Sequence, residues 1–452
     1  MNLSRIIKIT AAVMVAVFFL TKPSHFGEME FPVYTVVIDP GHGGSGIGPI
    51  EKHGDKFDTV SGTYLQRYAE GAGYGKLHES EIMYSISEKV IKILKLTETE
   101  KGYNQFRRIM LKYAAAPPRR VIIKSYSSRN ESINTSDFDE DEDINAPFRL
   151  YDFPDSGGKM NHGRISYINS LKPQLVVSLH CDSDAPADHR GIAAVAVPPF
   201  EFMKKALWFI EDRNRSIDYF RKSPYNQWFI EDDTRSAFQW HIDDAAAYFI
   251  GYGLNKNYSV NFDDFKGIRY NMTDWIYKDT PGWEQSFRDG SEKHYAKTLT
   301  AFDYTSAFWE REKSDFEKFR RDGGSEGYGG DNLYASNEVI RFILTSLKMS
   351  GNDHKDQYQG NPYFSTWSIP LYINAVSAFI ELGYLKNERY RKILTENQDE
   401  IAEGISMAVY SLVSGMELKD FDYEYGPKGE RIDFQKYNIG KGKTYFNVVT
   451  GK

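Results

Sequence analysis

The chain has 452 residues, and its 56 Lys and Arg side chains are outnumbered by 63 Asp and Glu side chains, which gives a net charge of −7. This balance provides no basic field for a polyanion, so we expect no nucleic acid partner. Cys181 is the one cysteine, which excludes an intramolecular disulfide and a multi-cysteine metal site. Any metal ion would need His, Asp and Glu as its ligands.

Residues 1–24 have the layout of an export signal. Arg5 and Lys8 precede an apolar run over residues 9–20, which is shorter than the roughly 20 residues of a membrane-spanning helix. The segment predicts export to the periplasm or cell envelope. Because no clean small-residue cleavage site precedes Phe26, an uncleaved anchor in contact with the membrane stays open. A buried helix of a cytoplasmic protein is the third alternative.

Residues 35–47 read TVVIDPGHGGSGI and carry the first candidate functional side chain. The apolar run 36–38 is typical of a strand buried in a parallel sheet. The glycine-rich sequence after it predicts a tight turn around His42. Because ligands of open α/β sheets bind at the carboxyl ends of strands, His42 is well placed for chemistry.

A polar stretch over residues 49–77 separates this turn from a predicted helix at 79–96. Apolar side chains recur in the helix at three-to-four spacing, which predicts a stripe that packs on a sheet. Glu79 in the first turn is a candidate metal ligand, and Glu81 is an equal candidate on composition. A carboxylate in the first turn also fits an ordinary helix start.

The α/β pattern continues with a strand at 120–124, a helix at 162–171 and a strand at 175–179. The helix carries Arg164 and Asn169, and His180 directly follows the second strand. Two histidines that each follow a buried strand can converge at one edge of a parallel sheet. Imidazoles in that arrangement are typical ligands of Zn²⁺.

The pattern is lost after a further strand at 191–197, and residues 200–330 predict a large, mainly helical insertion. A helix at 337–347 and a strand at 375–380 then return to the sheet, and Glu381 ends that strand. A glutamate at the end of a buried strand is costly without a charged or hydrogen-bonding partner, and a metal-bound water would serve as one.

We therefore expect an α/β fold with a mostly parallel sheet flanked by helices and a large, mainly helical insertion late in the domain. The predicted frame consists of residues 33–199 and 331–415, and a long helical pattern at 393–413 closes its core. Residues 416–452 form a polar tail whose role the sequence does not indicate.

With these residues assembled, the chain resembles the zinc-dependent N-acetylmuramoyl-L-alanine amidases, which cut the amide between N-acetylmuramic acid and the stem peptide of bacterial peptidoglycan. The shared motifs occur in the family's order over about residues 33–414, outside the insertion. They are VVIDPGHGG at 36–44, Glu79, Arg164 with Asn169, SLH at 178–180 and IELGYLKN at 380–387. The resemblance implies that His42, Glu79 and His180 bind zinc and that Glu381 is the catalytic carboxylate. It also implies substrate binding by Arg164 and Asn169, with peptidoglycan as the partner.

Two departures from the family's pattern stand near the predicted site. The loop before Glu79 is unusually long, and Cys181 and Asp182 occupy positions where the family usually has a small residue and an asparagine. The insertion 200–330 follows the strand at 191–197, roughly where regulated members carry a helix that plugs the zinc cleft. An inhibitory lid that a protein activator displaces is therefore a further expectation.

Two other functions stay open at this point. A zinc peptidase acting on soluble muropeptides would use the same four residues on another amide. A non-catalytic envelope-binding protein on the same frame would use the aromatic insertion as its contact surface.

Overall fold

The computed structural model describes most of the chain on either side of the predicted insertion. The described residues are 31–44, 46, 48–58, 63–130, 143, 145–184, 191–196, 329–352, 359, 363–364, 370, 373, 375–421 and 426–437. The predicted export signal at 1–24 lies outside them, and so does the insertion at 200–330 except for its last two residues.

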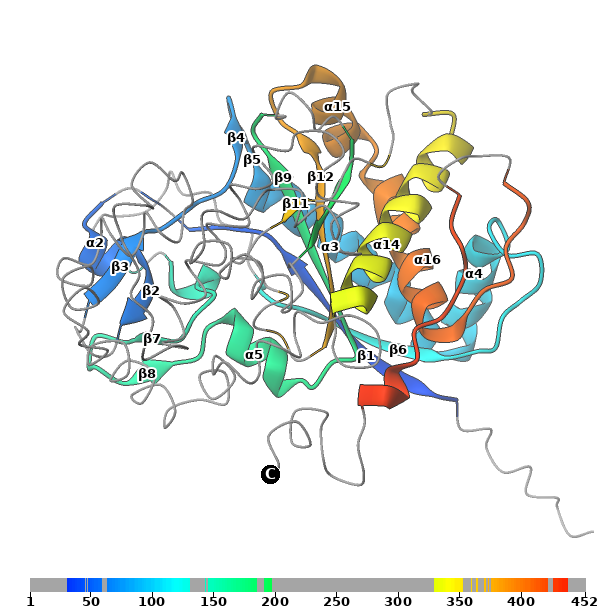
Figure 1. Cartoon of the computed structure of the whole chain (residues 1–452), viewed down its shortest axis with the longest axis horizontal. Coiled ribbons are helices and arrows are strands. Elements are labelled where there is room, and N and C mark those ends of the chain that lie inside the picture. Colours follow the sequence, from blue (N-terminus) through cyan, green and yellow to red (C-terminus); the bar gives the residue numbers. More distant parts are fainter. Residues whose placement is uncertain are drawn as a thin grey trace, which may run out of the picture.

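A six-stranded sheet in the order β11-β10-β12-β9-β1-β6 forms the centre of the described part of the chain (Figure 1). Its strands are β1 (Val33–Pro40), β6 (Ile122–Ser127), β9 (Leu175–Asp182), β10 (Ala193–Ala196), β11 (Tyr363–Phe364) and β12 (Val376–Tyr384). The pairs β6–β1, β1–β9, β9–β12 and β10–β11 are parallel, whereas β10 runs antiparallel to β12. The predicted mostly parallel sheet is therefore confirmed.

The apolar runs found in the sequence form the middle of this sheet. Val36, Val37 and Ile38 of β1 are fully buried, and Val176 and Val177 of the adjacent β9 are buried in the same way. Strands with apolar side chains on both faces are typical of parallel sheets covered on both sides. The sequence 36–38 therefore places β1 inside the sheet, with polar residues at its carboxyl end.

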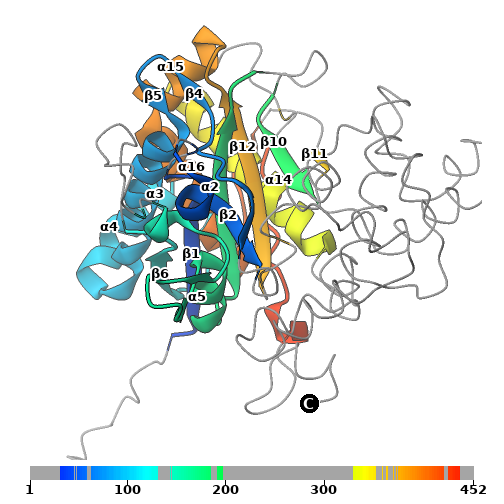
Figure 2. The ribbon, with the colours of Figure 1, turned by 90° about the vertical axis from the view of Figure 1, so that its left-hand side faces the viewer.

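Two helical layers cover the two faces of the sheet, as Figure 1 shows. The larger core lies against α3 (Glu79–Lys95), α4 (Glu100–Met110), α14 (Gly329–Met349) and α16 (Gln398–Ser414). A smaller core beneath α5 (Arg164–Ser170) covers the other face. Seen from the side in Figure 2, β10 and β11 lie past β12 at the outer edge of the sheet.

The helix α14 also protects part of β12 that β10 does not reach. Asn332 accepts a hydrogen bond from the backbone N–H of Ser377 at 2.7 Å, and Ser336 accepts one from the N–H of Phe379 at 3.1 Å. These two side chains satisfy strand groups that would otherwise be unpaired at the edge. Both side chains precede the helix predicted at 337–347, because α14 begins earlier, at residue 329.

The long helix predicted over residues 393–413 is two helices, α15 (Glu388–Glu396) and α16. Asn397 interrupts the helical backbone between them with φ −114° and ψ 30°. Its N–H donates to the carbonyl of Ile393, while its own carbonyl accepts from Ile401 at the start of α16. The break therefore leaves neither backbone group of Asn397 unpaired.

The polar stretch before α3 contains local structure of its own. It forms α2 (Ile50–His53) and two hairpins, β2 (Gly54–Asp58) with β3 (Thr63–Arg67) and β4 (Gly73–Tyr74) with β5 (Leu77–His78). A third small hairpin pairs β7 (Phe153–Pro154) with β8 (Met160–Asn161). Short 3₁₀ helices complete the described elements at η1 (Leu96–Glu98), η3 (Ala146–Phe148) and η6 (Phe434–Tyr437).

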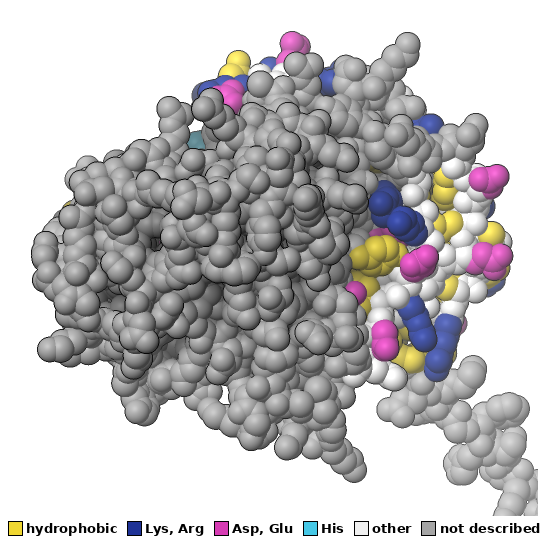
Figure 3. Space-filling view, viewed as in Figure 1, with side chains coloured by type: hydrophobic (Ala, Val, Ile, Leu, Met, Phe, Trp, Pro, Cys, Tyr) yellow, Lys and Arg dark blue, Asp and Glu magenta, His cyan; other side chains and the backbone are white. Residues whose placement is uncertain are grey.

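The first part of the predicted tail packs on the frame. Met416, Ile432 and Phe434 are buried in the larger core, and the N–H of Met416 donates to the carbonyl of Gly429. On the face drawn in Figure 3, acidic and basic side chains are interspersed over the described residues. Among the described helices, none is both long and apolar enough to cross a membrane.

Candidate metal centre

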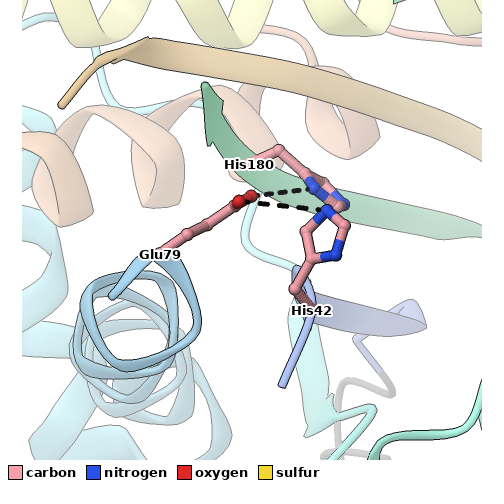
Figure 4. Close-up of side chains that lie close together, drawn as sticks. All are labelled: His42, Glu79 and His180. Atoms are coloured by element: carbon pink, nitrogen blue, oxygen red, sulfur yellow. Dashed lines mark ion pairs between the residues drawn. The ribbon is translucent and has the colours of Figure 1, made fainter. Parts of the chain in front are cut away.

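Three predicted site residues from distant parts of the chain meet beside the carboxyl ends of β1 and β9 (Figure 4). His42 follows β1, Glu79 begins α3 and His180 lies near the end of β9. One ligand atom from each residue lies within 4.8 Å of the other two. The structure therefore brings together the three residues that the sequence analysis assigned to a metal site.

The Glu79 carboxylate faces both imidazoles, as the dashed lines in Figure 4 indicate. Its Oε2 lies 3.8 Å from Nε2 of His42, and its Oε1 lies 3.0 Å from Nδ1 of His180. The two rings stand edge to face with their centroids 4.9 Å apart. Two ring nitrogens and a carboxylate oxygen thus point at one small volume.

The turn that carries His42 is held by two buried arginines. His42 itself has φ +53°, in the left-handed region that few non-glycine residues adopt. Arg129 donates from Nε to the carbonyl of Pro40 at 3.2 Å and from Nη2 to that of Gly41 at 3.3 Å. Arg164 donates from Nη1 to the carbonyl of His42 at 3.3 Å. Three successive carbonyls are fixed, so the surrounding structure stabilises the strained turn.

Glu79 is a buried, ionised carboxylate with only 2% of its side chain exposed. Burial raises its pKa, but the charge of His42 and the hydrogen bond and charge of His180 lower that pKa to about 2. Backbone N–H groups of Ala72 and Cys181 donate to its two oxygens at 2.7 and 3.1 Å. Glu81, the alternative from the sequence, is not in the metal-binding group formed by the described residues.

His180 is nearly buried, with 12% of its side chain exposed. Burial lowers its pKa, an effect that the hydrogen bond to Glu79 and the charge of Glu79 partly offset. The ring of Phe379 on β12 packs against it with the centroids 4.4 Å apart. Because a carboxylate only accepts hydrogen bonds, Nδ1 of His180 carries the proton of its contact with Glu79, and it would release that proton on binding a metal ion.

Glu381 lies beside His180 in the sheet register, on the neighbouring parallel strand β12. Its Oε2 is buried without a hydrogen-bond partner among the described residues. Burial, together with the negative charges of Glu79 and Asp182, raises the pKa of Glu381 well above its usual value. An unpaired buried carboxylate oxygen is costly, and a nearby cation or a water bound to one would relieve that cost.

These residues fit a metal ion on the chemistry of their donors. Two imidazoles and one carboxylate supply three ligands, which is the number that catalytic metal sites of this type take from the protein. Backbone N–H groups donate hydrogen bonds to both oxygens of Glu79. Carboxylates that bind a metal ion are generally oriented by such hydrogen bonds. Glu381, in register with His180 on the neighbouring strand, has a buried Oε2 without a hydrogen-bond partner among the described residues.

Beneath the site, Asp39 at the end of β1 is fully buried, and the sequence analysis did not single it out. Ser128 and Ser178 each donate to its carboxylate at 2.5 Å, and Nη2 of Arg164 donates at 2.8 Å. Burial acts to raise the pKa of Asp39, but Arg164 and the two serines hold it below its usual range. The signal in the sequence was an acidic residue that directly follows a buried apolar run, as for Glu381. Glu381 was predicted to end its strand but lies inside β12, because that strand continues to Tyr384.

The two residues predicted to bind substrate lie on α5, outside the group of candidate ligands. Arg164 is 5% exposed and its guanidinium is directed to Asp39 and the His42 carbonyl, within the frame. Asn169 is partly buried one turn further along the same helix. Their role in substrate binding stays a prediction.

The comparisons with known proteins come from solved structures. No protein-family model and no curated protein sequence matches the chain. The structure of the N-acetylmuramyl-L-alanine amidase Ami1 of Mycobacterium abscessus aligns at 11% identity and TM-score 0.31, over 84% of this chain and 97% of that one. Ami1 of Mycobacterium smegmatis aligns at 13% and 0.32, over 83% and 95%. An N-acetylmuramoyl-L-alanine amidase of Clostridium difficile 630 aligns at 14% and 0.30, over 84% and 96%.

Proposed function

We propose that this chain is a zinc-dependent N-acetylmuramoyl-L-alanine amidase that acts on peptidoglycan. The observation that carries the proposal is the meeting of His42, Glu79 and His180 within 4.8 Å, with Glu381 in register beside His180. These are the residues for which the family resemblance implies metal binding and catalysis. Cell-wall remodelling or daughter-cell separation is the corresponding role.

Zinc is the metal that the donor set favours. Two imidazoles and one carboxylate are the kind and number of protein ligands that catalytic zinc sites use. A bound Zn²⁺ supplies a Lewis acid and lowers the pKa of a water molecule to about 7, which makes hydroxide available near neutral pH. His42, Glu79 and His180 are the residues that would hold it.

Glu381 is the residue proposed to move the proton. It accepts a proton from the attacking water as the water oxygen bonds to the lactyl carbonyl carbon, and it then donates that proton to the alanine nitrogen as the C–N bond breaks. Acting as a base requires the ionised form, whereas burial and nearby acids raise the pKa of Glu381 in the chain alone. A cation held by His42, Glu79 and His180 would lower that pKa and favour the ionised form.

Further parts of the proposal concern residues around this centre. We infer that Arg164 and Asn169 contribute to substrate binding and that residues 1–24 direct export to the periplasm or envelope. The insertion at 200–330 is proposed as a lid, relieved by a protein activator. Deleting residues 200–330 tests the lid, because turnover should rise, whereas loss of folding or unchanged turnover counts against it.

Digestion of purified sacculi by the zinc-loaded full chain tests the proposed reaction. An amidase releases stem peptides that begin with an unblocked L-alanine and leaves the glycan strands intact. A peptidase acting on muropeptides would instead expose other amino termini, and an envelope-binding protein would sediment with sacculi without releasing peptides. Failure to bind zinc, or release of neither product, would overturn the proposal.

A further inference from the structure

The segment 69–72, at the end of the long polar stretch before α3, contacts two of the three proposed metal ligands. It reaches His42 through the carbonyl of Ala69 and Glu79 through the N–H of Ala72. These are backbone groups, so nothing in the side chains of this segment announces the contacts. We call residues 69–72 the brace.

The contact with His42 determines which ring nitrogen is free. Nδ1 of His42 lies 3.0 Å from the carbonyl oxygen of Ala69, and a carbonyl oxygen can only accept a hydrogen bond. Nδ1 therefore carries a proton, so in the neutral ring the lone pair is on Nε2, the atom that faces Glu79. Metal-binding histidines generally donate their second ring N–H to a carbonyl or carboxylate in this way.

The contact with Glu79 runs in both directions. The N–H of Ala72 donates to Oε2 of Glu79 at 2.7 Å, and the backbone N–H of Glu79 donates to the carbonyl of Ala72 at 2.9 Å. The second bond satisfies one of the free N–H groups at the start of α3, where the N-cap residue provides no side-chain acceptor. The brace thus fixes both the backbone and the carboxylate of this ligand.

Gly71 lies between these two contacts, at the point where the brace approaches both ligands. Its φ is +93°, and a Cβ added there would lie 2.7 Å from Cβ of His42 and 2.8 Å from Oε2 of Glu79. Contacts that short force atoms to move, and here the atoms belong to the two ligands. Any side chain at this position would therefore displace the proposed metal site.

The brace is anchored at both ends. Before it, the buried Tyr68 donates from its hydroxyl to the carbonyl of Phe148 at 2.8 Å. After it, Gly73 pairs with His78 in the β4–β5 hairpin, which leads directly into α3. A segment fixed at both ends can hold the ligands in place before a metal binds.

We propose that the brace is a positioning element of the metal centre, in which Ala69 sets the His42 tautomer, Ala72 orients Glu79 and Gly71 allows the close approach. This inference rests on the proposed function, because it takes His42 and Glu79 as zinc ligands. It adds residues 69–72, which lie outside the family motifs, to the residues that form the candidate metal centre.

Zinc titration of the full-length Gly71→Ala variant against a chelating indicator tests the proposal. Gly75→Ala is the matched control, because Gly75 also has a positive φ, +63°, in the adjacent turn, but a Cβ there meets no atom within 4 Å. Loss of an outer partner typically weakens metal binding about 10- to 100-fold. We expect that loss for Gly71→Ala, no more than about twofold change for Gly75→Ala, and a distorted Co²⁺ absorption spectrum for Gly71→Ala alone.

A measurement on the unaltered protein covers the case in which Gly71→Ala does not fold. Nitrogen-15 NMR of the metal-free wild type reports the tautomer of each imidazole, and the His42→Gln variant assigns the signal. The brace requires His42 to carry its proton on Nδ1. A neutral His42 that carries its proton on Nε2 and not on Nδ1, or zinc binding by folded Gly71→Ala as tight as in wild type, would overturn the proposal. Absence of zinc binding by the wild type would instead refute the proposed function.

Discussion

The buried pair of Arg164 and Asp39 supports the turn that carries His42, so replacing Arg164 by methionine should destabilise the fold. Asp39 is fully buried and Arg164 is 5% exposed, with 2.8 Å between Nη2 and Oδ1. Methionine keeps much of the side-chain volume and removes the charge. The variant leaves the Asp39 carboxylate with its two serine donors and leaves the His42 carbonyl without Arg164.

The magnitude follows from the burial of the remaining charge. Removing one partner of a buried ion pair costs about 3–5 kcal/mol, because the other charge stays buried without compensation. Since Ser128 and Ser178 still donate to Asp39, we expect the lower end, about 3 kcal/mol. Adding Asp39→Asn to Arg164→Met removes the uncompensated charge. The free energy of unfolding of the double variant should therefore fall by less than the sum of the two single losses, and the difference should be about 0.5–3 kcal/mol.

Urea unfolding of the wild type, the two single variants and the double variant measures this cycle. The exposed pair of Lys89 and Asp399 is the control, because Asp399 is 84% exposed although the two charged atoms lie 2.5 Å apart. The control variant Asp399→Asn should lose at most about 1 kcal/mol of the free energy of unfolding. The reasoning is refuted if Arg164→Met loses no more than Asp399→Asn, or if the cycle is additive.

Three further predictions concern the metal, the pH dependence and the tail. His180→Ala should lose bound zinc in elemental analysis, while His162→Ala, at a side chain 69% exposed, should keep it; equal zinc content would contradict the assignment. Because the pKa of Asp39 is lowered on folding, ionised Asp39 contributes to the free energy of unfolding above its unfolded pKa of about 3.9, and this contribution is lost as the pH falls through the folded pKa. The difference in the free energy of unfolding between wild type and Asp39→Asn should therefore shrink below about pH 4. A difference that does not depend on pH would refute this. Glu338→Ala removes the acceptor of the N–H groups of residues 428 and 429, so limited proteolysis should cut the tail faster than in wild type, and unchanged cleavage would show that this anchor is not needed.

The strands and the ligands at their ends were predictable because burial leaves a clear pattern. The apolar run 36–38 is fully buried in β1, and the strand before His180 is buried in β9. Since parallel strands end at one edge of the sheet, His42 just after β1 and His180 among the last residues of β9 converge there. Glu79 and Glu81 were not separable, because both lie in the first turn of α3 and only the direction of the helix decides which one faces the histidines.

The remaining features depend on groups that a sequence pattern does not mark. The brace acts through backbone carbonyl and N–H groups of Ala69 and Ala72, which every such residue possesses. The division between α15 and α16 depends on the backbone angles of Asn397, within a continuous helical pattern. The unpredicted α4 did have a signal, because Thr99 caps it by accepting from the N–H of Gly102 at 3.0 Å.

Hydrolysis of sacculi by Glu381→Gln, compared with wild type at equal zinc content, tests the central claim most directly. Glutamine keeps the shape of the side chain and cannot accept and return the proton. Because general acid–base catalysis contributes typically 10²–10⁴-fold, we predict full zinc occupancy with release of L-alanine-terminated peptides slowed by at least about 100-fold. A fully loaded Glu381→Gln variant that releases these peptides at the wild-type rate would contradict the account.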